Sequence, residues 1–552
     1  MEVSDLPRMV RNAGRFHEVV AVAAKYGLAP WLSNVPADWV QRHFRSRDGR
    51  QISELTEPQR VRMALAELGT TFIKLGQILS TRPDLVGLEM AAELTKLQSN
   101  TPADDPEQVV ATIQADLGQQ PDSLFREFDP QAFASASIGQ VHRAVLDDGT
   151  HVVVKVQHHG IEERVQNDLE ILLQLAELAE TYSKELAQFR PVATASEFRR
   201  TLLAELDFTR EERNLIRFTN NFRDDPGVCF PKPHPERCSR RVLTMDELQG
   251  ISVAKGPLLA EAGFDMTDVA RRGANMFLQM VFRDGFYHAD PHPGNLMVLQ
   301  DAAIGVLDCG MVGRVDEELR EQIEDLLLAA VDQDADRLTE TVVDLGEVPP
   351  NFDRSALRND LVQFVENYGT QSIDKFDLSG ALNEMTEIIR QHHILLPSRV
   401  SLLIKMLVML EGTSRQLSPD FSIAELLEPY RAEMIKRRMS PQRMLRKLQS
   451  AQRDWTRLAQ TFPGDIADLM ERIRRGSFDV KLEHRRLDSI VNRLVLGILT
   501  AALFVGSASL LSNQVKPLLW DTSVPGGIGA LTAVILGFTL VRAIRHSGSI
   551  EP

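Results

Sequence analysis

The amino-acid sequence predicts an α+β fold with two lobes, a small one that contains strands and a large helical one. Apolar residues recur at helical spacing in residues 1–100 and again from 316 to about 480. Short β-type runs begin near residue 124, between these two helical regions. Two apolar segments without charge follow near the C-terminus. With 552 residues, the chain is long enough for two or more domains with cores of their own.

Composition narrows the class of protein. The formal net charge is −15, which argues against nucleic acid as the main partner, because phosphate backbones attract basic surfaces. The three cysteines, Cys229, Cys238 and Cys309, are too few and too scattered for a disulfide framework or a CxxC zinc site, so we expect a reducing compartment. The first ten residues lack an apolar run, and no secretory signal is expected there.

Changes of pattern divide the chain into four predicted regions. A polar, proline-containing break at 100–108 is followed by a new helix start. The predicted regions are an N-terminal helical extension (1–122), a strand-containing lobe (123–250), a helical lobe (251–480) and a C-terminal membrane anchor (481–552).

The strand-containing lobe is expected to begin with a hairpin. "QVHRAVL" (140–146) and "HVVVKVQ" (151–157) are typical of strands, and Asp147-Asp148-Gly149-Thr150 between them is typical of a tight turn. Helical patterns (161–222) and a further strand, "RVLTMDEL" (241–248), come next.

The segment "YHADPHPGNLMVLQDAAIGVLDCG" (287–310) carries the strongest chemical signal. Asp290 is followed five residues later by Asn295 and, after two short apolar runs, by Asp308. Protein kinases place a catalytic aspartate, an asparagine and a metal-binding aspartate in this order. We therefore expect Asp290 to orient an attacking hydroxyl or water, and Asn295 and Asp308 to hold Mg²⁺. A coincidental polar loop would explain Asp290 alone, but the ordered set of three argues against it.

Upstream of this segment, Lys155 stands in an otherwise apolar strand. Taken alone, it is best explained as an edge lysine that extends to solvent, but its place after a hairpin and before the Asp290 loop matches the kinase lysine. The preceding loop has one glycine among small residues, which still let backbone N–H groups approach a phosphate. The predicted phosphate loop is Ala134, Ser135, Ala136, Ser137, Ile138, Gly139 and Gln140.

Two further motifs do not belong to an ordinary kinase. "FIKLGQ" places Lys74 and Gln77 on one helix face, and "AELDFTREERN" places Glu205, Asp207 and Glu211 on another helix. From periodicity alone, a solvated charged face is the simpler interpretation of both.

Together these motifs resemble the UbiB family of atypical kinase-like proteins, also known as aarF-domain-containing kinases. The resemblance covers roughly residues 60–545. It rests on KxGQ (Lys74–Gln77), the alanine-rich loop (Ala134–Gln140), Lys155, ExD (Glu205–Asp207), "HADPHPGN" (288–295) and the tail "NRLVLGILTAALFVGS".

The resemblance implies a protein-kinase-like two-lobed fold that binds ATP and Mg²⁺ between the lobes. The KxGQ helix would cover the cleft, so that Lys74 and Gln77 face the ExD residues. The strand at 241–248 would contain the adenine hinge, near Met245 and Leu248.

The ion pairs of the cleft also follow from the resemblance. By position, Glu211 is the expected partner of Lys155, with Glu205 as an alternative. Glu205 and Asp207 are the expected partners of Lys74.

The activity implied is that of an atypical kinase or ATPase that supports biosynthesis of ubiquinone or a related isoprenoid quinone. Membrane lipids, lipid-soluble quinone precursors and other quinone-biosynthesis proteins would be its partners. One departure is Cys309, where the family usually has phenylalanine in Asp-Phe-Gly. Asp308 and Gly310 are kept, so metal binding should survive, and a buried structural cysteine is expected at 309.

The two uncharged segments, Leu494–Leu511 and Val524–Val541, are each just long enough for the hydrocarbon core of a bilayer. Buried core helices are the alternative, but two such runs in tandem favour a transmembrane helix hairpin. The positive-inside rule then places both ends and the catalytic domain in the cytoplasm, at the inner membrane of a bacterial-type cell. The flanking basic residues are Arg485, Arg486, Arg493, Arg542 and Arg545, whereas the loop carries only Lys516 against Asp521.

Two weaker signals concern the membrane. Small residues four apart, at Ala502 and Gly506 and at Gly529 and Ala533, would let the two helices pack closely. The basic segment 435–453 would suit anionic lipid head groups, and a solvated helix face explains it equally well.

Three functions fit the sequence. The leading one is a membrane-anchored ATPase or atypical kinase of quinone biosynthesis. The second is a pseudokinase-like scaffold that binds nucleotide and gathers biosynthetic enzymes, motivated by the single-glycine loop and by a helix over the cleft. The third is a soluble phosphotransferase of the aminoglycoside or choline kinase type, against which KxGQ and the apolar segments argue.

Overall fold

The computed structural model divides the chain into two compact units, Met1–Ser440 and Pro441–Pro552. The basic segment 435–453 lies outside the residues that it describes. The described residues are 13–28, 55–97, 101–182, 190–349, 352–369, 376–419, 421–423, 425–427, 430, 487–513, 515–519 and 522–545.

The described part of the N-terminal region is helical, as expected. Proline occupies the first position of three helices. The N–H group at this position has no partner within the helix, so its absence costs no hydrogen bond. The helices are α2 (Ala13–Lys25), α4 (Glu57–Leu68), α5 (Thr70–Leu79), α6 (Pro83–Val86), α7 (Leu88–Leu94), α8 (Pro106–Leu117) and α9 (Pro121–Leu124).

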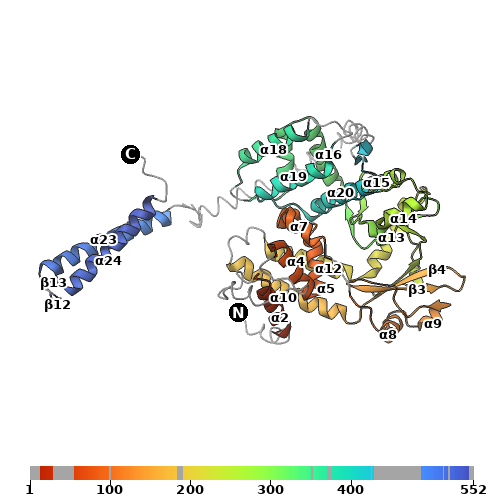
Figure 1. Cartoon of the computed structure of the whole chain (residues 1–552), viewed down its shortest axis with the longest axis horizontal. Helices are drawn as coiled ribbons and strands as arrows, with labels where there is room; N and C mark the ends of the chain where they lie inside the picture. Colours follow the sequence, from red (N-terminus) through yellow and green to blue (C-terminus); the bar gives the residue numbers. More distant parts are fainter. Residues whose placement is uncertain are drawn as a thin grey trace, which may run out of the picture. The chain divides into compact units, whose positions relative to one another are not determined.

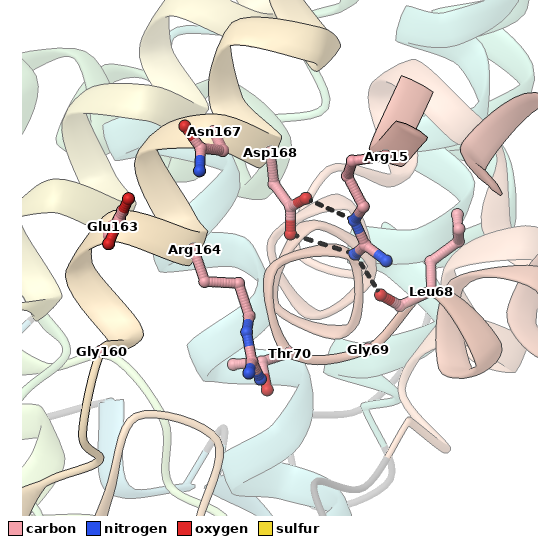
Figure 2. A pocket seen from close by; sticks show the side chains of 9 residues that line it. All are labelled: Arg15, Leu68, Gly69, Thr70, Gly160, Glu163, Arg164, Asn167 and Asp168. Atoms are coloured by element: carbon pink, nitrogen blue, oxygen red, sulfur yellow. Dashed lines mark hydrogen bonds and ion pairs between the residues drawn. The ribbon is translucent and has the colours of Figure 1, made fainter. Parts of the chain in front are cut away.

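A half-buried ion pair fastens α2 to the later helix α10 (Ile161–Tyr182). The Arg15 guanidinium donates to the Asp168 carboxylate at 2.8 and 3.2 Å and to the Leu68 carbonyl at 2.6 Å (Figure 2). These residues line a cavity of about 610 Å³ between α2, the junction of α4 and α5, and the start of α10. The N-terminal helices therefore pack on the body of the protein.

The first lobe is built on an antiparallel sheet with the order β1-β3-β4-β6, and β2 pairs with β3. Figure 1 shows β3 and β4 side by side in this sheet. The expected turn joins β3 and β4, and the Leu146 N–H donates to the Thr150 carbonyl at 2.9 Å. Helix α8, inside the range predicted for the extension, and helix α9, which crosses the predicted boundary at 122, share an apolar cluster with this sheet. The strands are β1 (Glu127–Phe128), β2 (Ala134–Ser135), β3 (Gly139–Val145), β4 (His151–Gln157) and β6 (Val242–Asp246).

Helices α10, α12 (Pro191–Glu205) and α13 (Phe208–Asn221) lie between β4 and β6 in the chain. The second lobe is mainly helical. It contains α14 (Gly256–Glu261), α15 (Met266–Phe282), α16 (Glu317–Val331), α17 (Ala335–Leu345), α18 (Arg354–Tyr368), α19 (Leu378–Gln391) and α20 (Ser398–Leu417).

Two small sheets complete the second lobe. One has the order β5-β10-β9-β7 and the other pairs β8 with β11. Their strands are β5 (Val228–Cys229), β7 (Gly250–Ser252), β8 (Phe286–His288), β9 (Leu296–Leu299), β10 (Ile304–Val306) and β11 (Val312–Arg314), with the short helices η3 (Pro235–Arg237), η4 (Val253–Lys255) and η5 (Pro293–Asn295).

The described residues of the C-terminal unit form a helical hairpin. Helices α23 (Leu487–Ser512) and α24 (Val524–Arg545) contain the two predicted apolar segments, and β12 (Leu518–Leu519) pairs with β13 (Thr522–Ser523) at the turn. By length and composition, Val495–Ser512 could cross a membrane, whereas the apolar stretch Val524–Phe538 is shorter than a usual span.

Small residues bring the two helices together, but only half of the predicted set does so. A Cβ at Gly529 would lie 2.3 Å from Ser507 Oγ, and Ala533 is buried. Gly506 is exposed, and a Cβ at this position would have no neighbouring atom within 4 Å. The expected contact of Gly506 with the other helix is therefore wrong. Ser507, one residue further on, faces α24 instead, because a helix turns by about 100° per residue.

Candidate active site

Two strand pairs bring the parts of segment 287–310 together. β8 pairs with β11, so that His288 lies opposite Val312, and β9 pairs with β10, so that Leu296 lies opposite Val306. Asp290 and Asn295 lie between β8 and β9, and Asp308 lies between β10 and β11. Both loops therefore stand at the same end of these strand pairs.

Asp290 is oriented by its own loop. The Asn295 Nδ2 group donates to Asp290 Oδ2 at 3.1 Å and to the Asp290 carbonyl at 3.2 Å. The Asp290 N–H donates to His288 Nδ1 at 3.1 Å, so the Nε2 atom of the buried His288 carries the hydrogen and donates to the Asp308 carbonyl. His288 thus links the two loops, and the predicted residues Asp290, Asn295 and Asp308 lie together.

Lys155 lies between two carboxylates. From β4, its Nζ reaches Glu211 Oε2 at 2.8 Å and Asp308 Oδ2 at 3.5 Å, and it stands 5.1 Å from the centre of the Phe208 ring. The predicted pair with Glu211 is therefore present. The alternative partner, Glu205, contacts Lys74 instead.

The cluster of Lys155, Glu211 and Asp308 has one ammonium for two carboxylates. Burial opposes the charge of Lys155, but Asp308 and Glu211 outweigh it and raise its pKa. Lys155 lowers the pKa of Asp308, whose Oδ1 also accepts the Gly310 N–H at 2.8 Å. Burial raises the pKa of Glu211 to about 7, with Lys155 opposing and Asp308 adding to the rise. The buried Glu211 Oε1 has no hydrogen-bond partner in the described part of the chain.

The KxGQ helix α5 contributes a second ion pair. Lys74 Nζ lies 2.7 Å from Glu205 Oε2, as predicted. Burial acts to lower the pKa of Lys74, but Glu205 outweighs this effect, and the pKa is raised. Asp308 and Lys155 also act on Lys74. The two ion pairs therefore belong to one electrostatic environment.

Two predicted contacts of these motifs are wrong. Gln77 Nε2 donates to the Leu97 carbonyl at 3.1 Å rather than to an ExD residue. Asp207 caps α13 by accepting the Thr209 N–H at 3.1 Å and the Thr209 hydroxyl at 2.6 Å, so Glu205 alone pairs with Lys74. An aspartate just before a helix satisfies N–H groups that the helix itself leaves free.

The glycine of KxGQ has a packing role. A Cβ at Gly76 would lie 2.2 Å from Leu97 Cδ1 and 3.0 Å from Leu65 Cδ1. Only a residue without a side chain lets α5 approach α4 and the segment after α7 this closely. Gly76 and Gln77 therefore fix the position of the helix that carries Lys74.

The predicted phosphate loop, residues 134–140, is a tight turn between β2 and β3. The Ala136 N–H donates to the Gly139 carbonyl at 2.9 Å, and His158 Nε2 contacts the Ala136 carbonyl at 3.0 Å. A Cβ at Gly139 would lie 2.6 Å from the Val156 carbonyl, so β4 requires this glycine whatever the loop binds. Gln140 is buried and accepts the Asp104 N–H at 2.9 Å. Of the seven residues, only Ala134 and Ala136 are exposed.

The predicted hinge joins the two lobes. Met245 is buried in β6 of the first sheet, and the segment with Leu248 leads to β7 of the second lobe. A Cβ at Gly305 of β10 would lie 3.1 Å from Leu248 Cδ1, so Leu248 packs on the second lobe. The proposed adenine contact of these two residues stays a prediction.

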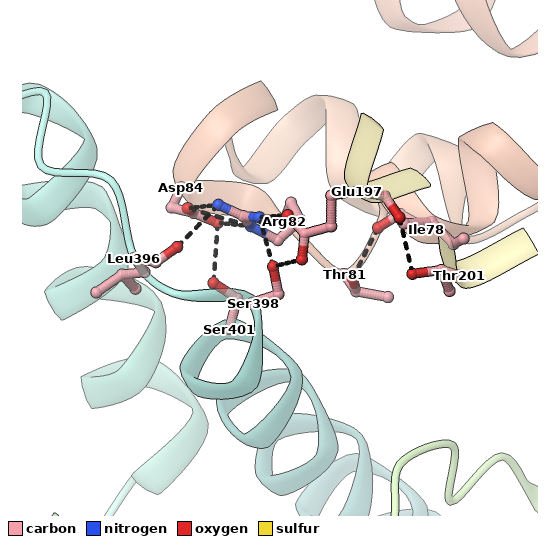
Figure 3. A network of polar contacts seen from close by, with 9 residues as sticks. All are labelled: Ile78, Thr81, Arg82, Asp84, Glu197, Thr201, Leu396, Ser398 and Ser401. Carbon is pink, nitrogen blue, oxygen red and sulfur yellow. Dashed lines mark hydrogen bonds and ion pairs between the residues drawn. The ribbon is translucent and has the colours of Figure 1, made fainter. Parts of the chain in front are cut away.

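A polar network fastens the KxGQ region to the second lobe (Figure 3). Arg82 donates to the Asp84 carboxylate at 2.8 and 3.0 Å, to Ser398 Oγ at 3.1 Å and to the Leu396 carbonyl at 3.0 Å. Ser401 Oγ donates to Asp84 Oδ1 at 3.2 Å. We call this network, on α6 and at the start of α20, the Arg82 clamp. Sequence reasoning missed it.

Comparison with known proteins places the chain in a family. The ABC1 atypical kinase-like domain matches residues 96–342, the UbiB helical domain 361–422 and the ABC1/UbiB kinase-like C-terminal domain 480–546. A probable protein kinase UbiB from Azotobacter vinelandii is 33% identical over 472 residues, which are 85% of this chain and 86% of that protein. The chain belongs to the UbiB family.

Two further proteins are similar to this chain. An uncharacterized protein in the hydrogenase 1 5′ region of Clostridium pasteurianum is 30% identical over 543 residues, 97% of this chain and 99% of that protein. The solved complex of Rv3197 with erythromycin from Mycobacterium tuberculosis is similar to 66% of this chain and 93% of that one, with 25% identity and a TM-score of 0.46. As a UbiB-family member, the chain is an atypical kinase-like protein with a mixed α and β, kinase-like fold, as predicted.

Cys309 is the residue at which this chain departs from the UbiB pattern. It is fully buried, and burial raises the pKa of its thiol well above the usual value. Asn214 Nδ2 donates to the Cys309 carbonyl at 2.9 Å and so fixes the backbone next to Asp308. The thiol stays protonated and packed, as expected for a structural cysteine.

Lys405 is a residue of this site that sequence reasoning missed. It stands in the apolar stretch "SLLIKMLVML" (401–410) of α20. Burial lowers its pKa, Asp290 raises it, and Lys74 lowers it further. Its ammonium therefore shares the environment of both groups. A lone lysine in an uncharged run was the available signal, as it was for Lys155 in β4.

The predicted metal ligands of this UbiB protein fit Mg²⁺. Mg²⁺ prefers oxygen ligands and keeps several positions for water or phosphate, so two protein residues suffice. Asn295 donates through Nδ2, which leaves its Oδ1 for a cation, and the Asp308 side chain is 51% exposed. In the described residues, no three or more His, Cys, Asp or Glu side chains converge.

Proposed function

We propose that this chain is a membrane-anchored atypical kinase or ATPase that binds Mg·ATP between its lobes and supports biosynthesis of ubiquinone or a related isoprenoid quinone. The observation that carries the nucleotide part is the cluster around Lys155, with Nζ 2.8 Å from Glu211 and 3.5 Å from Asp308. Its excess of negative charge and its unsatisfied Glu211 oxygen suit a site that a cation completes.

Each side chain then has a distinct task. Lys155, held by Glu211, binds phosphate oxygens of ATP. Asn295 and Asp308 would hold Mg²⁺, which would offset the negative charge of the phosphates. Asp290, oriented by Asn295, positions the attacking oxygen and accepts its proton.

The hairpin supports the membrane part of the proposal. Large apolar side chains on its surface are exposed, among them Val505 at 67% and Phe538 at 72%. A soluble protein rarely leaves so much contiguous apolar surface in water, whereas lipid would cover it. Membrane lipids, lipid-soluble quinone precursors and other quinone-biosynthesis proteins are the proposed partners, at an inner membrane with the catalytic domain in the cytoplasm.

The test of the nucleotide part is ATP hydrolysis by the full chain in phosphatidylcholine nanodiscs. Wild-type protein is expected to turn over Mg·ATP, and Asp308→Asn to lose roughly a hundredfold or more, because charge stabilisation of the transition state is removed. Asp224→Asn, at an exposed aspartate after α13, is the control. Equal turnover by wild type and Asp308→Asn would reject the metal role.

A nucleotide-binding scaffold is the second candidate. The Lys74–Glu205 pair and the Arg82 clamp favour it, because both hold the KxGQ helix in place beside the cleft. A rise in melting temperature with Mg·ATP, without turnover, would support this function over the first.

The quinone part is tested in cells. Deleting the gene is expected to remove the cell's isoprenoid quinone and to leave a prenylated precursor. The wild-type gene should restore the quinone, and the Asp308→Asn gene should not. Normal quinone content after deletion would refute this part and leave the nucleotide part intact.

A further inference from the structure

A large cavity adjoins the candidate active site. It has a volume of about 1220 Å³ and lies between α5, α12, the start of α13, β11 and the start of α20. Figure 3 shows Ile78, Thr201 and Ser398, which line it from three of these helices. Much of its wall is apolar, including Leu75, Ile78, Leu203, Met311 and Leu402.

Unpaired positive charge lines the rim. Arg213 donates only to the Thr209 carbonyl and hydroxyl of its own helix, at 3.0 and 3.4 Å, and the Arg314 guanidinium lies 5.9 Å from the Phe286 ring. Within the described residues, no carboxylate forms an ion pair with any of four exposed arginines of the lining. These are Arg200, Arg210, Arg213 and Arg314.

The carboxylates of the same cavity are already engaged. Glu205 pairs with Lys74 at 2.7 Å, and Glu197 accepts a hydrogen bond from Ser398. Asp207 is occupied as the cap of α13. The cavity therefore offers an anion several guanidinium groups with few competing acids, and guanidinium binds phosphate and carboxylate well.

One end of the cavity reaches the predicted metal site. Gly310 and Asn214 belong to its lining. The Gly310 N–H donates to Asp308 at 2.8 Å, and Asn214 holds the Cys309 carbonyl at 2.9 Å. A ligand in the cavity would thus lie against the turn that carries Asp308.

We propose that this cavity binds an anionic amphiphile, with its phosphate or carboxylate group on the arginine rim and its apolar body against α5 and α20. A bare phosphate would leave the leucine-lined wall empty, and a neutral lipid would leave the arginines without a partner. Binding itself does not depend on catalysis. That the bound amphiphile is the lipid-soluble molecule on which the enzyme acts rests on the proposed function.

The experiment locates a bound probe chemically. Full-length protein in phosphatidylcholine nanodiscs, without nucleotide, is irradiated with a ten-carbon alkyl phosphate that carries a diazirine, and labelled peptides are identified by mass spectrometry. Labelling is expected on α5 and α20, at Leu75, Ile78 or Leu402. Decyl phosphate should compete, and decyl maltoside, which has the same chain and no charge, should not.

Variants test the arginines separately from the fold. Arg200→Gln removes a rim arginine, and Arg199→Gln removes its exposed neighbour on α12, which does not line the cavity. Arg200→Gln loses a charge-assisted hydrogen bond, so competition by decyl phosphate should weaken roughly tenfold in this variant. In Arg199→Gln, competition should stay within about twofold of the wild type. Thr201→Trp fills the cavity without changing charge, since the Thr201 hydroxyl bonds only to Glu197 of its own helix. It should abolish labelling.

Several results would overturn the proposal. If Arg199→Gln and Arg200→Gln weaken competition by decyl phosphate equally, the rim arginines do not bind the anionic group. If Thr201→Trp is labelled as strongly as the wild type, the probe does not bind in this cavity. Displacement of the probe by inorganic phosphate at the concentration of decyl phosphate would assign the site to free phosphate. ATP turnover without labelling here would reject the amphiphile site alone, and labelling without turnover would reject the proposed activity alone.

Discussion

Two charge networks lie close together in this protein, one buried and one that opens to solvent at Asp308, and they differ in how completely their charges are satisfied. In the Arg82 clamp, each nitrogen of the guanidinium has a partner, and the Asp84 carboxylate accepts hydrogen bonds from Arg82 and Ser401. In the Lys155 cluster, two carboxylates share one ammonium, and a buried Glu211 oxygen has no hydrogen bond in the described structure.

This difference indicates that the Arg82 clamp stabilises the fold and that the Lys155 cluster serves function. A buried ion pair with every hydrogen bond made holds two segments together and offers a ligand nothing. A partly buried cluster with like charges side by side costs stability until a ligand of the opposite charge binds, and such groups gather at functional sites. Changes in the first network should therefore affect stability, and changes in the second should affect activity.

The largest expected effect is on turnover, at Asp290. Asp290→Asn keeps the shape of the side chain but removes the carboxylate that accepts a proton, so ATP turnover should fall roughly 10²–10⁴-fold. The melting temperature should stay within the error of the wild type. Steady-state hydrolysis beside calorimetry measures both. If Asp290→Asn loses stability but retains turnover, Asp290 has a structural role, and the contrast between the two networks does not hold.

The second effect is on stability, at Asp84. Asp84→Asn removes the buried counter-charge of Arg82 and leaves only the more exposed Glu197, whose Oε2 lies 3.6 Å from Arg82 Nη1. The change should lower the free energy of local opening around α6 by roughly 1–3 kcal/mol. Native-state hydrogen exchange of α5, α6 and the start of α20 measures it. Asp336→Asn, which removes an exposed partner of Arg358, is the control and should change nothing measurable. Wild-type exchange in Asp84→Asn would show that the clamp does not fasten the helix.

The Lys155 cluster was largely predictable from the sequence, and the clamp was not. Lys155, Asp290, Asn295 and Asp308 stand out because each breaks an apolar or polar pattern, and their order along the chain matches a known arrangement. Arg82 and Asp84, two residues apart, look like any solvated pair. Their partners, Leu396 and Ser398, lie more than 300 residues away, and no local pattern specifies such a contact.

Local geometry also decides which of two similar residues makes a contact, and residue type alone does not predict this. Asp207 and Glu205 are both acids of one motif, but Glu205 ends α12 and Asp207 caps α13, so only Glu205 reaches Lys74. Likewise Gly506 and Ser507 are both small, and the rotation of α23 decides that Ser507 faces α24. Errors of one or two residues in helix phase are enough to exchange such roles.

The third effect is a pH dependence at Glu211. Its pKa of about 7 exceeds the usual 4.5, so the folded protein binds this proton more tightly than the unfolded chain does. The stability from this proton is complete below about pH 4.5 and is lost as the pH rises through about 7. Glu211→Gln cannot ionise, so it should gain stability over the wild type as the pH rises from 5 to 8, by roughly 3 kcal/mol at most.

Melting temperatures of both proteins, in buffer without magnesium and nucleotide, measure this gain. A difference that does not change with pH would show that Glu211 is as well satisfied as Asp84, and the contrast between the two networks would disappear. Loss of ATP turnover in the same Glu211→Gln protein is expected at every pH, because Lys155 loses the group that holds it.

The smallest effect is expected at Lys405, which acts on the site without an ion pair in the described structure. Lys405 shares the electrostatic environment of Asp290, and its positive charge would offset the negative charge of the phosphates there. Lys405→Met should therefore lower turnover about tenfold, which corresponds to about 1.4 kcal/mol. Lys405→Arg should restore most of it, and Lys232→Met, at an exposed lysine, should match the wild type. If Lys405→Arg fails to restore activity while both proteins melt alike, shape rather than charge matters at this position. If Lys405→Met melts at a lower temperature and keeps its turnover, Lys405 stabilises the fold, as the Arg82 clamp does. Its charge would then matter for the stability of the protein and not for the chemistry of the cleft.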